Sequence, residues 1–189
     1  METLNNSESH LGGNINFGDP HTHSPDSWDY LIKRFSPRSV LDVGSGRSYS
    51  SSYFYRAGLQ VIAVDGLREN CEKAVYPTLQ VDLSKTSVFC PVDLVHCQEL
   101  VEHVEEQYVE NVLQTLANGR FIVMTNALPG QGGYHHVNEK PTEYWIAHLE
   151  RYGYSVLPED TNRLRRIAAN EGAIYLAKTG LILWNNDRF

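Results

Sequence analysis

The sequence predicts an α/β protein whose doubly wound, mostly parallel sheet of about seven strands is flanked by helices. Two observations favour this fold class. Apolar runs of strand length alternate with stretches that repeat apolar residues at helical spacing, and small or acidic residues follow the ends of successive runs. The chain has 189 residues, of which 41% are hydrophobic, so it can form one domain with a sizeable core.

The first βαβ unit is predicted in the N-terminal third of the chain. Residues 40–43 form an apolar run typical of a buried strand, and residues 49–57 form a helix that Gly58 ends. A second apolar run, residues 61–64, leads to Asp65, whose carboxylate can accept hydrogen bonds from ribose hydroxyls. The loop between the first strand and the helix is built from small residues: Gly44, Ser45 and Gly46. We interpret this unit as an adenosine-binding half.

The alternation continues on both sides of this unit. Before it, apolar residues that recur from Trp28 to Phe35 predict a helix. Pro25 suits its first turn, and Ser24 or Asp26 can cap it. After the unit, the predicted elements are strand 78–82, strand 92–97, helix 105–116, strand 121–125, helix 142–153, strand 154–157, helix 160–178 with Gly172 as a candidate break, and strand 180–184.

Composition limits the class of protein. We expect residues 1–16 to form a flexible N-terminal tail and residues 17–189 to form a single domain. The net charge of −7 argues against a nucleic-acid partner. We expect no membrane contact and a cytoplasmic location, because no apolar run has bilayer length and the N-terminus is polar. The three cysteines lack CxxC spacing and are expected to be free thiols.

The carboxyl ends of the predicted strands carry residues suited to binding: Gly44, Asp65, Asp82, Gln98 and Asn126. In a parallel sheet these ends meet at one edge, where ligands bind. The sequence therefore predicts one site assembled from five places in the chain. The long Gly-rich loop 127–138 follows the fifth strand, and we expect it to contribute to the site.

Four segments carry a resemblance to a known family. VLDVGSG, VIAVD, VDL and CQELVEHV, all within residues 40–125, resemble motifs of the class I S-adenosylmethionine-dependent methyltransferases, which have a seven-stranded Rossmann-like fold. The resemblance implies this fold, S-adenosylmethionine as cofactor and methyl transfer as activity. It also implies that the cofactor is held by Asp42, Gly44, Ser45, Gly46, Asp65, Gly66, Asp82, Leu83, Gln98 and Glu99. The chain departs from the pattern at Ser48, where a third glycine is usual.

Within this set, the resemblance implies a distinct role for each strand end. The glycine loop meets the methionine and ribose part of the cofactor, and Asp65 holds the ribose hydroxyls. Asp82 and Leu83 meet the adenine, with the Asp82 carboxylate accepting from its amino group. Gln98 and Glu99 face the methionine and the substrate.

The same α/β fold also serves other functions. A nicotinamide-dependent enzyme needs glycine where Tyr49 stands, and no tyrosine of the chain has a lysine four residues later. A non-catalytic adenosyl-binding protein stays open as an alternative, and a nucleic-acid methyltransferase would need a positive surface beside the cofactor cleft.

A hydroxyl acceptor needs a base or a metal ion to take up its proton. The candidate catalytic residues are His135, His136 and Glu99. We expect His103 to be structural and His21 and His23 to be solvated or capping groups, so no set of metal ligands is predicted, although assistance by a divalent ion stays open. The N-P-P-[FY] motif of amino-group methylation is absent after the fourth strand, which favours a hydroxyl of a small molecule or saccharide.

Overall fold

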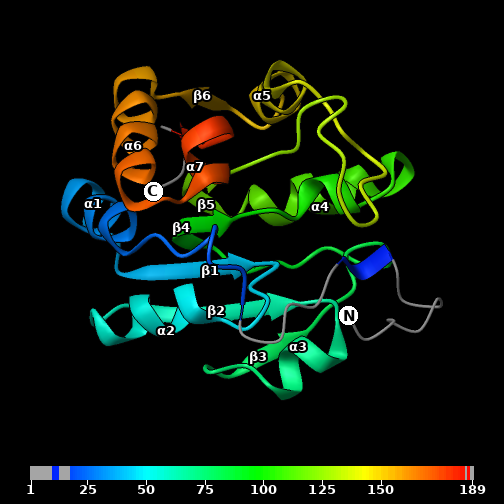
Figure 1. The fold of residues 1–189 in the computed structure, drawn as a ribbon, viewed down its shortest axis with the longest axis horizontal. Helices are drawn as coiled ribbons and strands as arrows, with labels where there is room; N and C mark the ends of the chain where they lie inside the picture. Colours follow the sequence, from blue (N-terminus) through cyan, green and yellow to red (C-terminus); the bar gives the residue numbers. More distant parts are fainter. Residues whose placement is uncertain (1–9, 13–17, 186, 188–189) are drawn as a thin grey trace.

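The computed structural model describes residues 10–12, 18–185 and 187, which form one sheet covered by helices on both faces (Figure 1). Among these residues the sheet has seven strands in the order β3-β2-β1-β4-β5-β7-β6. The strands are β1 Ser39–Val43, β2 Gln60–Asp65, β3 Thr78–Gln80, β4 Val92–Cys97, β5 Gly119–Met124, β6 Tyr154–Val156 and β7 Leu181–Asn185. Neighbours are parallel except where β7 pairs antiparallel with β5 and β6. The predicted fold class is confirmed.

The helices connect successive strands. They are α1 Pro25–Phe35, α2 Tyr49–Arg56, α3 Arg68–Glu72, α4 Val109–Leu116, α5 Thr142–Glu150, α6 Pro158–Glu171 and α7 Ile174–Thr179, and the 3-10 turns η2 Val101–His103 and η3 Glu106–Tyr108 precede α4. The predicted break at Gly172 is confirmed, because this residue ends α6 with φ of +80°.

Alternate residues of the central strands face two separate cores. Val40 and Leu94 pack with α1, α2, α6 and α7, whereas Leu41 and Val95 pack with α4 and α5. Figure 1 shows α1, α6 and α7 grouped together. Successive side chains of a strand point to opposite faces, so a strand covered on both faces needs apolar residues throughout. This is why the central strands could be recognised as continuous apolar runs.

The start of α1 is stabilised from a distant part of the chain. Pro25 occupies the first turn as predicted, but the hydroxyl of Ser24 donates to the carbonyl of Thr22 instead of capping the helix. The carboxylate of Glu171, at the end of α6, accepts from the backbone N–H groups of Asp26 (2.9 Å) and Ser27 (3.2 Å). The cap predicted within the local sequence is therefore wrong, because α6 supplies it.

Two predicted boundaries also differ from the structure. The strand predicted over 78–82 ends at Gln80, so Asp82 lies in the following loop. The helix predicted over 105–116 begins only at Val109, since residues 106–108 form η3. Both changes lie at the edge of the sheet that carries the site.

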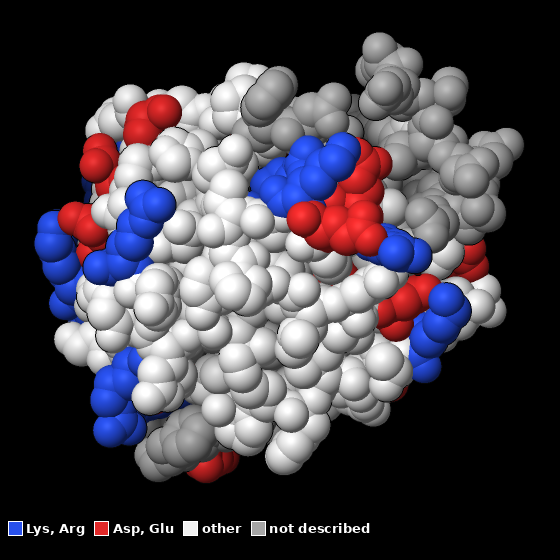
Figure 2. All heavy atoms as spheres, turned by 90° about the horizontal axis from the view of Figure 1, so that it is seen from below, with Lys and Arg blue, Asp and Glu red and all other residues white. Residues whose placement is uncertain are grey.

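The predicted N-terminal tail, residues 1–16, lies mostly outside the described residues. Its described part, residues 10–12, contacts the domain through His10 and Leu11. Within the described ranges, no helix combines the length and apolar character that crossing a bilayer requires. Figure 2 shows one face of the molecule, on which Lys and Arg of the described residues lie beside Asp and Glu and form no continuous basic surface. The three cysteines are free thiols, as predicted.

Candidate active site

The glycine loop after β1 is fixed to the end of β2. The carbonyl of Val64 accepts from the N–H groups of Gly44 (2.9 Å) and Ser45 (3.0 Å). Gly44 and Gly46 have φ of +68° and +54°, a conformation that glycine adopts without steric cost. A Cβ on Gly44 would lie 2.9 Å from the side chain of Leu100, so the segment after β4 approaches the loop closely because residue 44 is glycine.

Ser48 keeps the left-handed conformation that a third glycine would adopt, with φ of +60°. Its hydroxyl lies 3.0 Å from that of Ser45 and 2.6 Å from that of Thr78. Left-handed backbone costs a non-glycine residue about 1–2 kcal/mol. These side-chain bonds offset part of that cost.

Asp42 lies beneath the glycine loop and is only 1% exposed. One carboxylate oxygen lies 2.8 Å from His96 Nδ1, and the other accepts from the hydroxyls of Ser50 (2.6 Å) and Ser51 (2.5 Å). Burial alone would raise the pKa of Asp42, but His96 and the two hydroxyls outweigh it and lower the pKa. Both oxygens are thus used within the protein, and direct contact of Asp42 with a cofactor stays a prediction.

Asp65 connects the end of β2 with the glycine loop. Its carboxylate accepts from the N–H groups of Gly46 (2.7 Å) and Leu67 (2.9 Å) and from the amide of Asn70 (3.1 Å). Burial raises its pKa to about 6, against the opposing effect of the backbone N–H groups. A carboxylate has about four acceptor positions, so three bonds leave room for a further donor.

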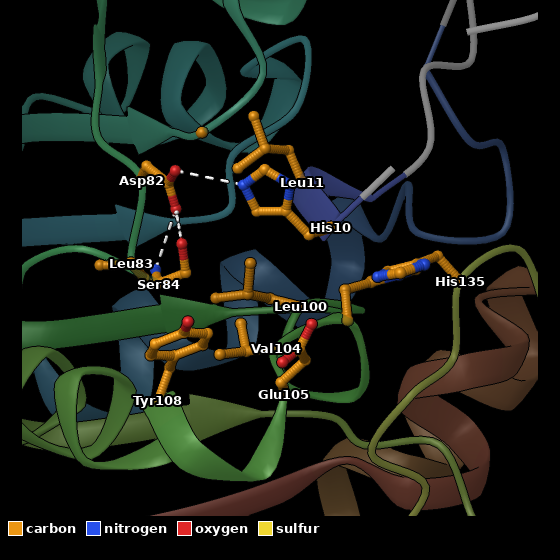
Figure 3. A pocket seen from close by; sticks show the side chains of 12 residues that line it. His10, Leu11, Asp82, Leu83, Ser84, Leu100, Val104, Glu105, Tyr108 and His135 are labelled. Carbon is orange, nitrogen blue, oxygen red and sulfur yellow. Dashed lines mark hydrogen bonds and ion pairs between the residues drawn. The ribbon is translucent and has the colours of Figure 1, made fainter. Parts of the chain in front are cut away.

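A cavity of about 350 Å³ lies next to the loops after β2, β3 and β4 (Figure 3). The residues assigned to the cofactor that line it are Gly66, Asp82 and Leu83. Opposite them, His103, Tyr108 and His135 line the same cavity. The structure therefore brings three of the ten residues predicted to hold the cofactor, together with two histidines, around one space. The other seven do not line this cavity: Asp42, Gly44, Ser45, Gly46, Asp65, Gln98 and Glu99.

Part of this cavity is occupied by the chain itself. His10 Nε2 lies 3.2 Å from Asp82 Oδ2, and Figure 3 shows this histidine pointing toward the carboxylate. Asp82 also accepts from the backbone N–H and the hydroxyl of Ser84 (2.9 and 2.6 Å) and pairs with Lys85 (2.7 Å). Burial would raise the pKa of Asp82, but Lys85, Ser84 and His10 together lower it. Leu11 packs closely on Gly66: a Cβ on residue 66 would lie 2.8 Å from the Leu11 side chain.

The segment after β4 bends sharply at Glu99, which has φ of +50°. Thr125, just after β5, accepts from the backbone N–H of Glu99 and donates its hydroxyl to the Glu99 carboxylate, both at 2.8 Å. Burial raises the pKa of Glu99. The neighbouring Gln98 is buried, and its amide nitrogen has no hydrogen-bond partner among the described residues.

The predicted histidines of the long loop reach the same region. His135 lines the cavity, and the ring of His136 lies edge-on to that of His103, with centroids 5.0 Å apart. One ligand atom each of Glu102, His103 and His136 lies within 4.8 Å of the other two. Glu102 was not among the residues predicted from the sequence, and His103 was expected to be structural. A signal for this cluster was available in the sequence: Glu99 and Glu102 are three residues apart, and His103 follows directly.

Comparisons with known proteins agree with this architecture. No protein-family model matches the chain. A ubiquinone biosynthesis O-methyltransferase of Rickettsia typhi is 28% identical over 128 residues, which cover 58% of this chain and 52% of the relative. The chain thus spans about half the length of the curated relative that it matches.

Solved structures are similar at the level of the fold. A magnesium protoporphyrin IX methyltransferase from Synechocystis with bound S-adenosylhomocysteine has a TM-score of 0.59 and 17% identity over 79% of this chain and 83% of that chain. The methyltransferase domain of bacterial CtHen1 has a TM-score of 0.56 and 18% identity over 70% of this chain and 85% of that chain. The [4+2]-cyclase SpnF has a TM-score of 0.57 and 13% identity over 89% of this chain and 85% of that chain. These neighbours carry two different kinds of activity in their names, so the likeness establishes the fold alone.

Proposed function

We propose that this chain, which has the seven-stranded fold of the class I S-adenosylmethionine-dependent methyltransferases, binds S-adenosylmethionine and methylates a hydroxyl of a small molecule or saccharide. One observation carries the proposal. The cavity of about 350 Å³ is lined both by Asp82 and Leu83, which are assigned to the adenine, and by His103 and His135. A bound cofactor and an acceptor can therefore meet beside groups able to take up a proton.

The residues of the site fit an adenosyl cofactor. The positive φ angles of Gly44 and Gly46 open the backbone for close approach of a ligand, and Asp65 keeps an acceptor position for a ribose hydroxyl. Asp82 can accept from the adenine amino group once His10 leaves its carboxylate. When bound, S-adenosylmethionine supplies a methyl group activated by a sulfonium.

The chain contributes orientation and proton transfer. Well-oriented reactants reach effective molarities of roughly 10⁵ M or more, so fixing an acceptor in the cavity supplies most of the acceleration. His135 lines the cavity, and its Nε2 has no hydrogen-bond partner among the described residues. We assign His135 as the group that would accept the proton of the acceptor hydroxyl during methyl transfer. The name of the curated relative, an O-methyltransferase, supports an oxygen acceptor.

A second function is favoured by the occupied cavity. His10 and Leu11 line the cavity beside Asp82 and leave less room for an acceptor, as expected for an adenosyl-binding protein that does not methylate. The similarity to a protein named as a cyclase is consistent with this alternative. Catalytic turnover distinguishes the two functions.

The first test is calorimetric titration of the full chain with S-adenosylmethionine, S-adenosylhomocysteine and NAD in parallel. We expect micromolar binding of both adenosyl compounds and none of NAD. Transfer of a radiolabelled methyl group to a panel of hydroxylated small molecules and saccharides then tests catalysis. Binding without transfer to any acceptor would favour the non-catalytic alternative, and a folded protein that binds neither adenosyl compound would refute the proposal.

Asp65→Ala tests the placement of the ribose. Losing a charged acceptor should weaken S-adenosylmethionine binding by about 1.5–3 kcal/mol, measured by the same calorimetry. Glu143→Ala on the exposed surface of α5 is the matched control and should leave the affinity unchanged. Equal affinity of Asp65→Ala and the unmodified chain, with the fold intact, would contradict the placement.

A further inference from the structure

Buried acidic and imidazole side chains gather beside the cavity, beyond the residues assigned to the cofactor. Glu102 and His103 belong to η2, and His136 belongs to the loop after β5. Each side chain offers one ligand atom, and these atoms all lie within 4.8 Å of one another. Because bonds from a transition metal to nitrogen or oxygen are about 2.0–2.2 Å long, two ligands of one ion lie at most about 4.4 Å apart. Side-chain shifts of a few tenths of an ångström therefore bring all three groups within reach of one ion.

Glu102 is the least satisfied of these groups. Its exposed fraction is 0%, and its carboxyl group lies against that of Glu99, with no well-aligned hydrogen-bond donor to its oxygens among the described residues. Burial and the charge of Glu99 raise its pKa well above the ordinary value. A carboxylate buried beside a second carboxyl group is unfavourable, and a bound cation relieves this cost.

His103 is held in the form that binds metals. Burial, with the charge of His136 as a smaller contribution, lowers its pKa to about 4, so the imidazole is neutral at neutral pH. Its Nδ1 is buried and has no hydrogen-bond partner within the described ranges. A neutral imidazole nitrogen with a free lone pair is the commonest metal ligand in proteins.

His136 is oriented by a carboxylate behind it. Its Nδ1 lies 3.3 Å from Glu139, which is itself fixed by the N–H groups of Gly130 (2.7 Å) and Gly132 (2.6 Å). Metal-binding histidines commonly contact a carboxylate through their other nitrogen, which leaves Nε2 for the ion. A Cβ on Gly133 would lie 2.3 Å from this Nε2, so the ring of His136 can take this orientation only because residue 133 is glycine.

Backbone hydrogen bonds connect the two segments that carry the cluster. The carbonyl of Glu102 accepts from the N–H groups of Val137 and Asn138, both at 3.0 Å. These bonds hold the long loop against η2 without help from an ion. The ligand set is therefore assembled in advance, which lowers the cost of binding.

We propose that Glu102, His103 and His136 bind one divalent transition-metal cation, with Glu99 as a supporting carboxylate. Two imidazoles and a carboxylate favour ions such as Mn²⁺, Fe²⁺, Co²⁺ or Zn²⁺ over Ca²⁺. This site is separate from the residues His21 and His23, which contact the rings of Tyr175 and Trp28.

The role of the cation rests on the proposed function. His103 belongs both to the cluster and to the lining of the cavity, so an acceptor hydroxyl in the cavity lies next to the ion. A bound cation makes a coordinated hydroxyl more acidic. The O–H bond breaks with its proton passing to His135, the oxygen bonds to the methyl carbon, and the carbon–sulfur bond breaks with its electron pair left on sulfur.

The test measures ion binding alone, with neither cofactor nor acceptor present. After removal of metals by a chelator, the full chain is titrated with Mn²⁺ by calorimetry and electron paramagnetic resonance, and with Ca²⁺ in parallel. We expect one Mn²⁺ per chain, Ca²⁺ bound at least tenfold more weakly, and a rise in Tm of roughly 5–10 °C when Mn²⁺ is at 100 times its Kd.

Variants separate metal binding from a purely structural role. Glu102→Gln and His136→Asn should each weaken Mn²⁺ binding by at least tenfold. Without metal, Glu102→Gln should leave Tm unchanged or raise it, because it removes an unpaired buried carboxylate. His21→Asn, an exposed histidine outside the cluster, is the matched control and should bind Mn²⁺ like the unmodified chain.

Three outcomes would overturn the proposal. Absence of Mn²⁺ binding would mean that Glu102 shares a proton with Glu99 instead. Unchanged binding by both variants would place the ion elsewhere, and equal affinity for Ca²⁺ would exclude the histidines as ligands. Each result is independent of S-adenosylmethionine titration, so failure of the metal site and failure of the proposed function can be told apart.

Discussion

The two halves of the candidate active site differ in how their polar groups are satisfied. In the cofactor half, Asp42, Asp65 and Asp82 each accept several hydrogen bonds from the chain itself. In the acceptor half, Glu102 and His103 are buried or nearly buried and leave nitrogen or oxygen atoms without partners among the described residues. The carboxylates of the cofactor half are thus satisfied within the chain, whereas the acceptor half keeps polar atoms for which the described residues supply no partner.

The two halves of the site therefore perform different tasks. The carboxylates of the cofactor half fix the shape of the glycine loop before any ligand binds, which is a structural task. Buried polar atoms without partners destabilise a fold, so their presence in the acceptor half indicates a ligand of matching chemistry.

Asp42→Ala should cause the largest loss of stability. The substitution removes the acceptor shared by His96, Ser50 and Ser51 in a fully buried position, and breaking such a set costs about 3–5 kcal/mol. Urea unfolding followed by circular dichroism measures the change. A loss below 1 kcal/mol would show that the cofactor half does not depend on its internal bonds.

Asp65 should make stability depend on pH. Its pKa is raised from 3.8 to about 6 in the folded state, so the folded state binds more protons between these values. The free energy of unfolding should therefore fall as the pH rises from about 4 to about 6, by up to about 3 kcal/mol, and stay level above that range. Urea unfolding at a series of pH values measures it.

The control for this pH dependence is Asp65→Asn, in which the side chain no longer titrates. The decline between pH 4 and 6 should shrink in this variant. If both proteins show the same decline, groups other than Asp65 cause it.

Ser48 allows strain to be separated from hydrogen bonding. Ser48→Ala loses the hydroxyl contacts with Ser45 and Thr78 and keeps the left-handed backbone, whereas Ser48→Gly loses the same contacts and relieves the strain. The glycine variant should be more stable than the alanine variant by about 1 kcal/mol, measured by thermal unfolding. Equal stabilities would mean that the loop relaxes around the alanine.

His10→Ala should have the smallest effect, and in the opposite direction. Removing the imidazole frees an acceptor position on Asp82, so S-adenosylmethionine should bind more tightly by about 0.5–1.5 kcal/mol, or roughly 2- to 10-fold. Calorimetric titration measures the affinity. Weaker binding would instead show that His10 assists the cofactor, and His23→Ala, at an exposed position outside the cavity, serves as the control.

The sequence predicted the parts of the molecule that depend on local pattern. Continuous apolar runs gave the central strands, and Gly44 and Asp65 marked strand ends because parallel strands bring those ends together. The cap of α1 by Glu171 was not predictable, since it joins residues more than a hundred positions apart. The contact of His10 with Asp82 was not predictable either, because 72 positions separate these two residues.

The acceptor half was predicted only in part. His135, His136 and Glu99 were placed at this site, and their catalytic roles stay predictions. Glu102 was missed because burial of a carboxylate without a partner cannot be read from a sequence. This burial depends on the long loop after β5, which packs against Glu102 and whose Val137 donates its N–H to the Glu102 carbonyl.

The position of β7 in the sheet affects how the sheet can form during synthesis of the chain. This strand follows all the others in the sequence, yet it inserts between β5 and β6. On a ribosome, the nascent chain therefore exposes the edges of both strands until residue 185 has emerged, and such unpaired edges readily join foreign strands. Loss of residues 181–185 would thus divide the sheet, separating β6 from the rest instead of shortening it at its margin.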